Sequence, residues 1–133
     1  MVLAAGSVFG AGTAKADGDH LYGAIAFSEE SWVYGTSVDA ETRGAAVDEA
    51  LAWCEFMGGS DCVVLVDWSD GCGALVYSDY AVGSGWGSDR RKALAYAYSS
   101  LAELHPPAVL ANVGSAELSG AHISEVLCTA NAY

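Results

Sequence analysis

The sequence predicts a single α+β domain built from two similar β-β-α-β halves, which form a mainly antiparallel sheet with two helices packed on it. Three observations predict this fold. The chain has 133 residues, 53% of them hydrophobic and 17% charged, which suits one domain with a buried core. A short apolar segment occurs once in each half of the chain. Four cysteines, an even number, are available to form disulfides that stabilise the domain.

The repeated segment is a strand in both halves. Residues 22–28 read Tyr-Gly-Ala-Ile-Ala-Phe-Ser and residues 72–78 read Cys-Gly-Ala-Leu-Val-Tyr-Ser, with most positions identical or similar. Both segments are short, apolar and bounded by turn-forming residues, which is typical of strands. A second segment with aromatic residues follows each of them, at residues 32–35 and 80–83. We interpret each pair as two consecutive strands.

A helix follows the second strand of each half, because apolar residues recur there at helical spacing. In the first half the expected N-cap is Asp39 and Gly58-Gly59 ends the helix. In the second half the expected N-cap is Ser88 and His105-Pro106-Pro107 ends the helix. The expected buried stripes are Val47, Ala50, Leu51 and Cys54 in the first helix, and Ala93, Leu94, Ala97 and Leu101 in the second.

The last strand of each half is predicted at residues 62–66 and 123–129. The continuous apolar run at 62–66 is typical of a central strand covered on both faces. Residues 108–120 have no counterpart in the first half. We interpret them as an inserted loop with a helical turn at 115–118.

The N-terminus predicts export. Residues 2–14 are apolar or small, and Ala14-Lys15-Ala16 fits a cleavage box, so residues 1–16 form a signal peptide and residues 17–133 the mature domain. No basic residue precedes the apolar run, which indicates that the signal peptide is truncated at its start. The run is too short to span a bilayer. The alternative is a buried N-terminal strand or helix. The expected location is secreted or in the cell envelope.

The four cysteines, at positions 54, 62, 72 and 128, indicate two disulfides in an exported domain. Three pairings are possible. The preferred one is Cys54–Cys62, closing a short loop at a helix end, and Cys72–Cys128, tying the middle of the chain to its C-terminus. Zinc is the competing interpretation, although the tight C-x2-C pairs of structural zinc sites are missing.

These residues together resemble a known family. The 22–28 segment, the step from Cys54 to Cys62-Val63-Val64, the Cys72-Gly73-Ala74-Leu75 run and the last cysteine at 128 are similar to domain-of-unknown-function family 4189. That family is found in exported bacterial proteins, many of them actinobacterial and mycobacterial. The resemblance implies export, two disulfides and the twofold plan, and no catalytic residues. The segment 104–120 and the tail 129–133 are longer than the family pattern implies.

Charge and motifs exclude several function classes. Asp and Glu outnumber Lys and Arg by 17 to 5, so the chain repels nucleic-acid phosphates and anionic membranes. The histidines His20, His105 and His122 lie far apart in the sequence, and no G-x-S-x-G elbow exists. A calcium loop centred on Gly71 fails at its first and last positions. We predict no catalytic residue, metal or cofactor.

The remaining carboxylates and the aromatic residues each have a structural interpretation and a functional one. Solvated turns are the structural interpretation of Glu29-Glu30, and of Asp67 and Asp70 beside a tryptophan. The functional alternatives are acid–base catalysis by these carboxylates or, for Asp67 and Asp70, a looser metal site with oxygen ligands. Tryptophans near turns fit either core packing or a binding surface. The expected aromatic members of such a surface are Trp32, Trp68 and Trp86.

The main basic cluster, Arg90, Arg91 and Lys92, follows the glycine-rich stretch 83–88. It fits either anion or partner binding at a helix start, or a glycine turn beside a solvated helix face. We include it in the expected binding surface.

The leading hypothesis is a non-enzymatic exported domain, monomeric or weakly oligomeric, that binds a protein or an envelope component. The alternative is a cell-envelope hydrolase or a carbohydrate-binding accessory module. It requires a concave pocket where Glu29, Glu30, Asp67 or Asp70 meets one of the three tryptophans. A third hypothesis is an inert stability module.

Overall fold

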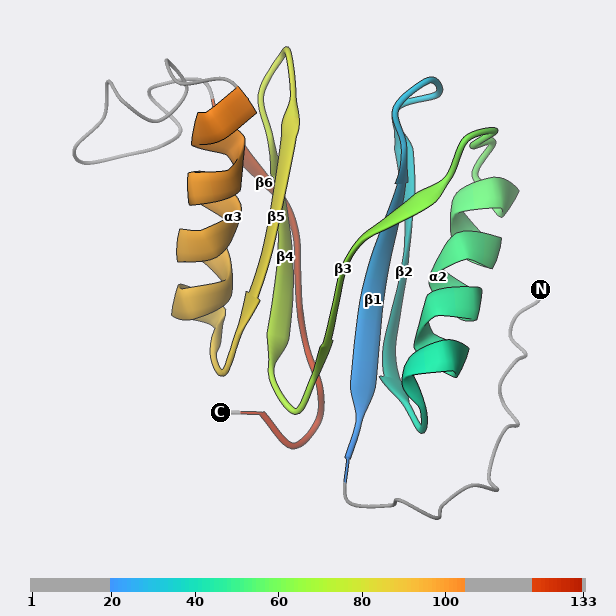
Figure 1. Cartoon of the computed structure of the whole chain (residues 1–133), viewed down its shortest axis with the longest axis vertical. Helices are drawn as coiled ribbons and strands as arrows, with labels where there is room; N and C mark the ends of the chain where they lie inside the picture. The colour runs from blue at the N-terminus through green and yellow to red at the C-terminus, as the bar shows by residue number, and fades with distance from the viewer. Residues whose placement is uncertain (1–19, 105–120, 133) are drawn as a thin grey trace.

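The fold has four layers, in the order helix, sheet, sheet, helix (Figure 1). The structure is a computed structural model that describes residues 20–104 and 121–132. The elements are β1 (Tyr22–Ser28), β2 (Val33–Ala40), α2 (Arg43–Phe56), β3 (Val63–Ser69), β4 (Cys72–Tyr77), β5 (Val82–Gly87), α3 (Arg90–Leu104) and β6 (His122–Cys128). The signal peptide 1–16, the helix end at 105–107, the inserted loop at 108–120 and its turn at 115–118 lie outside the described residues.

The two β-β-α-β halves are confirmed, and each forms a three-stranded antiparallel sheet of its own. The strand orders are β2-β1-β3 and β5-β4-β6. The repeated segment is the central strand in both sheets, and each helix crosses over it to connect the two edge strands. The expected single sheet is thus divided into two. β3 is an edge strand, which corrects the expectation of a central one, and its first residue, Val63, is 56% exposed.

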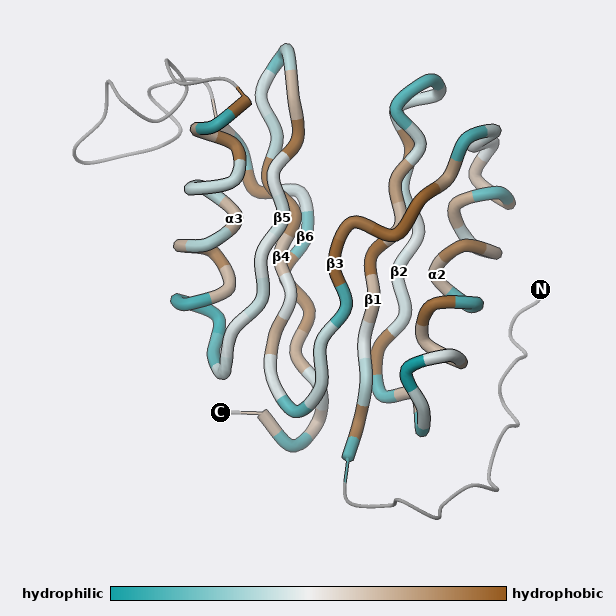
Figure 2. Tube along the Cα trace, in the orientation of Figure 1, coloured by the Kyte–Doolittle hydropathy of each residue, from teal (hydrophilic) through white to brown (hydrophobic). Residues whose placement is uncertain are grey.

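Successive side chains of each central strand point to opposite faces of its sheet, and this alternation divides the apolar residues into three layers. Ala24 and Ala26 of β1 face α2, whereas Ile25 between them faces the other sheet. In β4, Ala74 and Val76 face α3 and Leu75 faces the other sheet. Small side chains thus lie under the helices and large ones fill the space between the sheets. Figure 2 shows the apolar run of β3 beside β1; of this run, Leu65 and Val66 belong to the layer between the sheets.

The helices start at different residues from those expected. Thr42, not Asp39, caps α2, because its hydroxyl accepts the N–H of Ala45 at 3.0 Å. At the start of α3 the Asp89 carboxylate accepts the N–H of Lys92 at 2.9 Å, which replaces the expected Ser88 cap. The buried helix residues include Ala50 and Cys54 in α2 and Ala93, Ala97 and Leu101 in α3.

Close approach of helix and strand explains the glycine-rich stretch. A Cβ on Gly83 would lie 2.4 Å from the Ala97 carbonyl oxygen, and one on Gly85 would lie 2.4 Å from the Ala97 nitrogen. Residues 83–87 are therefore strand β5 with α3 lying directly on it, and not the turn expected from the sequence. Gly35 has the same role in β2, where a Cβ would lie 2.2 Å from the Cys54 nitrogen of α2.

The preferred disulfide pairing is confirmed. Cys54 at the end of α2 is bonded to Cys62, with the Cα atoms 6.2 Å apart. Cys72 of β4 is bonded to Cys128, its direct partner on β6, with the Cα atoms 4.0 Å apart. No described cysteine is free, which leaves no thiolate for the zinc alternative. Within the described residues, neither helix is long and apolar enough to cross a membrane.

Candidate functional site: two grooves beside the edge strands

The tryptophans of the expected binding surface have different environments. Trp68 is only 1% exposed and lies between the two sheets, so it is a core residue and not part of a surface. Trp32 and Trp86 are 45% and 52% exposed. Trp32 precedes β2, whereas Trp86 lies near the end of the equivalent strand β5. The two exposed tryptophans therefore belong to separate sites at opposite ends of their strands.

The first site, which we call the Trp32 groove, lies where β2 meets the end of α2. Its volume is about 440 Å³. The β1–β2 turn supplies Trp32, the last turn of α2 supplies Trp53, and Met57 is the C-cap residue that follows this helix. The lining residues are Trp32, Val33, Tyr34, Gly35, Thr36, Trp53 and Met57. The Cys54–Cys62 disulfide lies directly beside Trp53 in the chain and fixes this end of the helix.

The backbone at Trp32 adopts an unfavourable conformation for its side chain. Its φ is 57°, in the left-handed region where glycine and asparagine are favoured. The Trp32 N–H donates to the Ser28 carbonyl at 2.8 Å, which closes the turn. The indole packs edge-on against Phe27, with the ring centroids 5.2 Å apart. A bulky aromatic residue is thus held, half-exposed, at a position that a glycine would fill with less strain.

Exposed apolar side chains continue from this groove at the end of α2. Phe56 is 69% exposed and Met57 is 56% exposed. Phe56 packs edge-on against Trp53, with the ring centroids 5.4 Å apart. Trp53, Phe56 and Met57 were not predicted from the sequence. Trp53 and Met57 follow the buried residues Ala50 and Cys54 by three positions, so helical spacing places them beside the buried stripe and gives no sign that they line a groove.

The second site, which we call the Trp86 groove, runs along the outer edge of β5. Its volume is about 650 Å³. One wall comes from β3 and the other from the first turns of α3. The lining residues are Leu65, Val66, Ser84, Gly85, Trp86, Gly87, Lys92 and Tyr96. Tyr96, which is 62% exposed, was also missed by the sequence analysis.

The expected basic cluster lies at one end of the Trp86 groove. Arg90, Arg91 and Lys92 are exposed in the first turn of α3, and Lys92 lines the groove itself. The Lys92 ammonium donates to the Ser88 hydroxyl at 3.2 Å. The Asp89 carboxylate already accepts a backbone N–H group at the N-terminus of α3. This donor is therefore not available to an external anion, which argues against anion binding by the backbone there. The side-chain cations remain available.

Three of the four carboxylates named for the hydrolase alternative, Glu30, Asp67 and Asp70, have hydrogen-bond or ion-pair partners outside the grooves. Asp67 forms an ion pair with Arg43, whose guanidinium also lies over the Tyr22 ring. Glu30, in the β1–β2 turn, accepts the Ser60 hydroxyl at 2.8 Å. The nearby Asp61 carboxylate has its pKa lowered, first by the Ser28 hydroxyl that donates to it. Neither groove is lined by Glu29, Glu30, Asp67 or Asp70.

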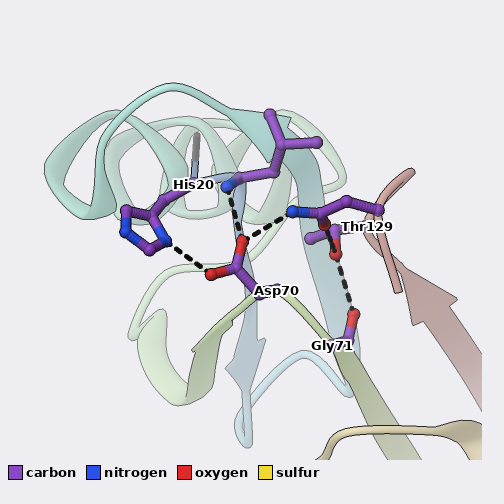
Figure 3. A network of polar contacts seen from close by, with 6 residues as sticks. His20, Asp70, Gly71 and Thr129 are labelled. Atoms are coloured by element: carbon purple, nitrogen blue, oxygen red, sulfur yellow. Dashed lines mark hydrogen bonds and ion pairs between the residues drawn. The ribbon is translucent and has the colours of Figure 1, made fainter. Parts of the chain in front are cut away.

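Asp70 joins the start and the end of the domain (Figure 3). One carboxylate oxygen accepts the Leu21 N–H at 3.0 Å and the Asn131 amide at 2.8 Å, and the other lies 2.6 Å from the His20 Nδ1. The tail is also held by Thr129, whose N–H donates to the Gly71 carbonyl at 2.8 Å. Residues 129–132 of the tail are therefore part of the fold.

The donors to Asp70, Asn131 first and then His20, lower its pKa from 3.8 to about 2. We expect Asp70 to stabilise the fold fully above about pH 4 and to lose that contribution as the pH falls towards 2. Asp70→Asn should therefore be less stable than the parent protein at pH 7, and the difference should shrink below pH 4. Urea unfolding across this range measures it. Asp48→Asn, on the exposed face of α2, is the control. An Asp70→Asn deficit that is equal at pH 7 and pH 2 would contradict the prediction.

Asp39, which was expected to cap the first helix, instead holds the tail by a hydrogen bond. Its φ is 66°, and its carboxylate accepts the Ala130 N–H of the tail at 2.7 Å. Of the histidines, His20 contacts Asp70 and His122 packs on Tyr77 with the ring centroids 5.2 Å apart, while His105 is outside the described residues. Among residues 20–104 and 121–132, no group of three His, Cys, Asp or Glu side chains could hold a metal ion.

Comparisons with known proteins agree with this fold. The NMR structure of Rv1813c from Mycobacterium tuberculosis is similar, with a TM-score of 0.53 and 24% sequence identity, over 81% of this chain and 74% of that one. This likeness concerns the fold alone. No curated protein matches the chain. The family model described as "Domain of unknown function (DUF4189)" matches residues 22–110. The chain belongs to the DUF4189 family.

Proposed function

We propose that this chain is an exported, disulfide-stabilised domain that binds a partner protein through the Trp32 groove and has no catalytic role of its own. The observation that carries the proposal is Trp32 itself. A half-exposed indole is kept in a left-handed backbone conformation, which costs about 1–3 kcal/mol for a residue other than glycine. Strain of this kind at an exposed aromatic residue supports a binding function. Two disulfides support an oxidising location, secreted or in the cell envelope.

The chemistry of the Trp32 groove favours a protein over a sugar. Sugar sites combine an aromatic platform with several hydrogen-bonding side chains around it. Here the lining is mainly apolar, and the Tyr34 hydroxyl already donates to Glu125 at 3.0 Å. Burial raises the pKa of Tyr34, which keeps this hydroxyl a neutral donor. Trp53 and Met57 offer an adaptable apolar contact of the kind that protein interfaces use.

The surroundings of the groove indicate the charge of the partner. Glu29 and Glu30 are exposed in the same turn as Trp32, and the whole chain carries a net charge of −12. An acidic surface speeds the approach of a cationic partner and repels an acidic one. The occupant of the Trp32 groove is therefore an apolar segment flanked by basic residues.

The test uses Trp32→Gly, because glycine suits the left-handed turn. We expect this variant to fold with equal or greater stability and to lose binding by a factor of about ten or more. The full chain, produced in secreted form, is immobilised and exposed separately to the protein and polysaccharide fractions of the producer's envelope. The parent protein should retain a defined polypeptide, which is then purified and its affinity measured. Tyr80→Ala, an exposed aromatic residue in the other half, is the control and should bind like the parent.

Other outcomes decide against the proposal. Retention of polysaccharide alone would favour the carbohydrate-binding module, and turnover of that polymer would favour the hydrolase. Equal affinity of the parent protein and Trp32→Gly for the partner would show that the Trp32 groove is not the binding site. A secreted chain that retains nothing above background would support an inert stability module. Finding the chain in the cytoplasm with free thiols would contradict export.

A further inference from the structure

The outer edge of β5 carries backbone groups that none of the other described strands uses. The Ser78 N–H donates to the Ala81 carbonyl at 2.9 Å, so these two residues form a hydrogen-bonded pair at the hairpin. Such pairs alternate along antiparallel strands, so Gly83, Gly85 and Gly87 direct their N–H and C=O groups towards β4. The N–H and C=O groups of Ser84 and Trp86 therefore point away from β4. Within the described residues, β5 pairs with no other strand.

This edge forms the floor of the Trp86 groove. Leu65 and Val66 of β3 line one side, and Lys92 and Tyr96 of α3 line the other. The Ser84 hydroxyl donates to the Leu65 carbonyl at 3.4 Å, which sets the distance between β5 and β3 at the inner end. An extended peptide paired with β5 would place alternate side chains against these two walls.

The basic side chains beside the Trp86 groove carry positive charge, whereas the molecule as a whole is negatively charged. Arg90, Arg91 and Lys92 account for three of the chain's five lysines and arginines, although the net charge is −12. Arg43, by contrast, is paired with Asp67. In the part of the chain that the structure describes, Arg90, Arg91 and Lys92 form no ion pair. The local field thus favours a carboxylate-bearing ligand at the end of β5 where α3 begins.

We propose that the β5 edge is a strand-addition site for an extended acidic peptide of a partner protein. The peptide pairs with the outward N–H and C=O groups of Ser84 and Trp86. It places apolar side chains against Trp86 and Leu65, and acidic side chains, on the opposite face, towards Lys92. A second copy of this chain is a poor occupant because two surfaces of net charge −12 repel each other. The proposal concerns a groove separate from the Trp32 groove and does not depend on it.

The test uses a synthetic peptide of about eight residues that alternates glutamate with valine, which suits the two unlike walls of the groove. Binding to the oxidised full chain is measured by fluorescence anisotropy, and the contacted amides by NMR. We expect binding that weakens as salt is raised, with the largest shifts at the Ser84 and Trp86 amides. A peptide with lysine in place of glutamate should bind at least about tenfold more weakly.

Two matched variants separate backbone pairing from simple apolar contact. Ser84→Pro removes the outward N–H, which an edge strand tolerates, and should weaken binding about tenfold or more. Ser84→Ala removes only the hydroxyl and should bind within about twofold of the parent. Lys92→Glu should also weaken binding and reduce its salt dependence. Thermal unfolding of each variant checks that it is folded.

The proposal is overturned by any of three results. One is no binding of the alternating acidic peptide to the parent protein. Another is equal affinity for Ser84→Pro and Ser84→Ala in folded protein, which would indicate contact without strand pairing. The third is amide shifts confined to residues 32–36 and 53–57, which would place the peptide in the Trp32 groove. Trp32→Gly should leave peptide binding unchanged, so failure of the proposed function and failure of this site are distinguishable.

Discussion

Replacing Trp68 with alanine is expected to lower the free energy of unfolding by about 3–5 kcal/mol, the largest effect of any single substitution proposed for this chain. Trp68 is the largest side chain that is fully buried, and it lies in the layer between the sheets with Ile25 and Leu75. Its removal leaves a cavity that the two sheets can fill only by moving together. Urea unfolding of the oxidised protein measures the change.

The position of the Trp68 ring explains why the repeated segment has a glycine in both copies. A Cβ on Gly23 would lie 2.4 Å from the indole, and one on Gly73 would lie 2.1 Å from it. The glycines come from the central strands of the two sheets, so the ring lies against both. Gly73→Ala should also be destabilising, because neither the strand backbone nor the buried ring can move away freely.

Two comparisons make this prediction specific. Trp86→Ala removes the same side chain from an exposed site and should cost about 1 kcal/mol or less. Trp68→Phe should be milder than Trp68→Ala, because it keeps most of the ring. It also removes the indole N–H, which has no hydrogen-bond partner among the described residues. Equal losses for Trp68→Ala and Trp86→Ala would show that Trp68 does not hold the sheets together.

Loss of the Cys72–Cys128 disulfide is expected to cost about 4 kcal/mol, against about 2.5 kcal/mol for Cys54–Cys62, in the chain-entropy account. The two bonds close loops with sequence separations of 56 and 8. The longer loop contains β5 and α3, and the bond also ties the last strand to the central strand of its sheet. The double variants Cys72→Ala/Cys128→Ala and Cys54→Ala/Cys62→Ala are compared by thermal and urea unfolding.

The second disulfide provides the control for the first. Without Cys54–Cys62 the fold should remain largely intact, and the effect should concentrate at the end of α2, where Trp53 and Met57 line the Trp32 groove. Binding to that groove should weaken more than overall stability does. If the short-loop variant proves the less stable of the two, local packing around Cys54 outweighs loop entropy, and the ranking is wrong.

Several features of the fold could be predicted from the local sequence. The repeated segment identified the two central strands, because each copy is a short apolar run between turn-forming residues. Helical spacing identified most of the buried residues of α2 and α3. The preferred cysteine pairing was correct. The strands and helices depend on residues close in sequence or on a repeat, so pattern alone could find them. The Cys72–Cys128 bond instead joins residues separated by 56 positions, and it was one of three possible pairings.

The candidate sites depended on contacts between distant segments. Trp68 was expected at the surface because it lies near a turn, but the opposing sheet covers it. The stretch 83–87 was expected as a glycine turn, but α3 lies on it and makes its glycines necessary in a strand. Trp53 and Tyr96 were not singled out, because a helical aromatic residue gives no local sign of whether a neighbour covers it.

The sequence by itself determined the two halves, their strands and helices and the material for their disulfides, because hydrophobic periodicity and repetition are local properties. Only the tertiary structure decided that the halves form two facing sheets rather than one. That choice depends on where the large side chains of both halves meet, at Trp68, Ile25 and Leu75. The same packing decides which aromatic residues remain exposed and so where the two grooves lie.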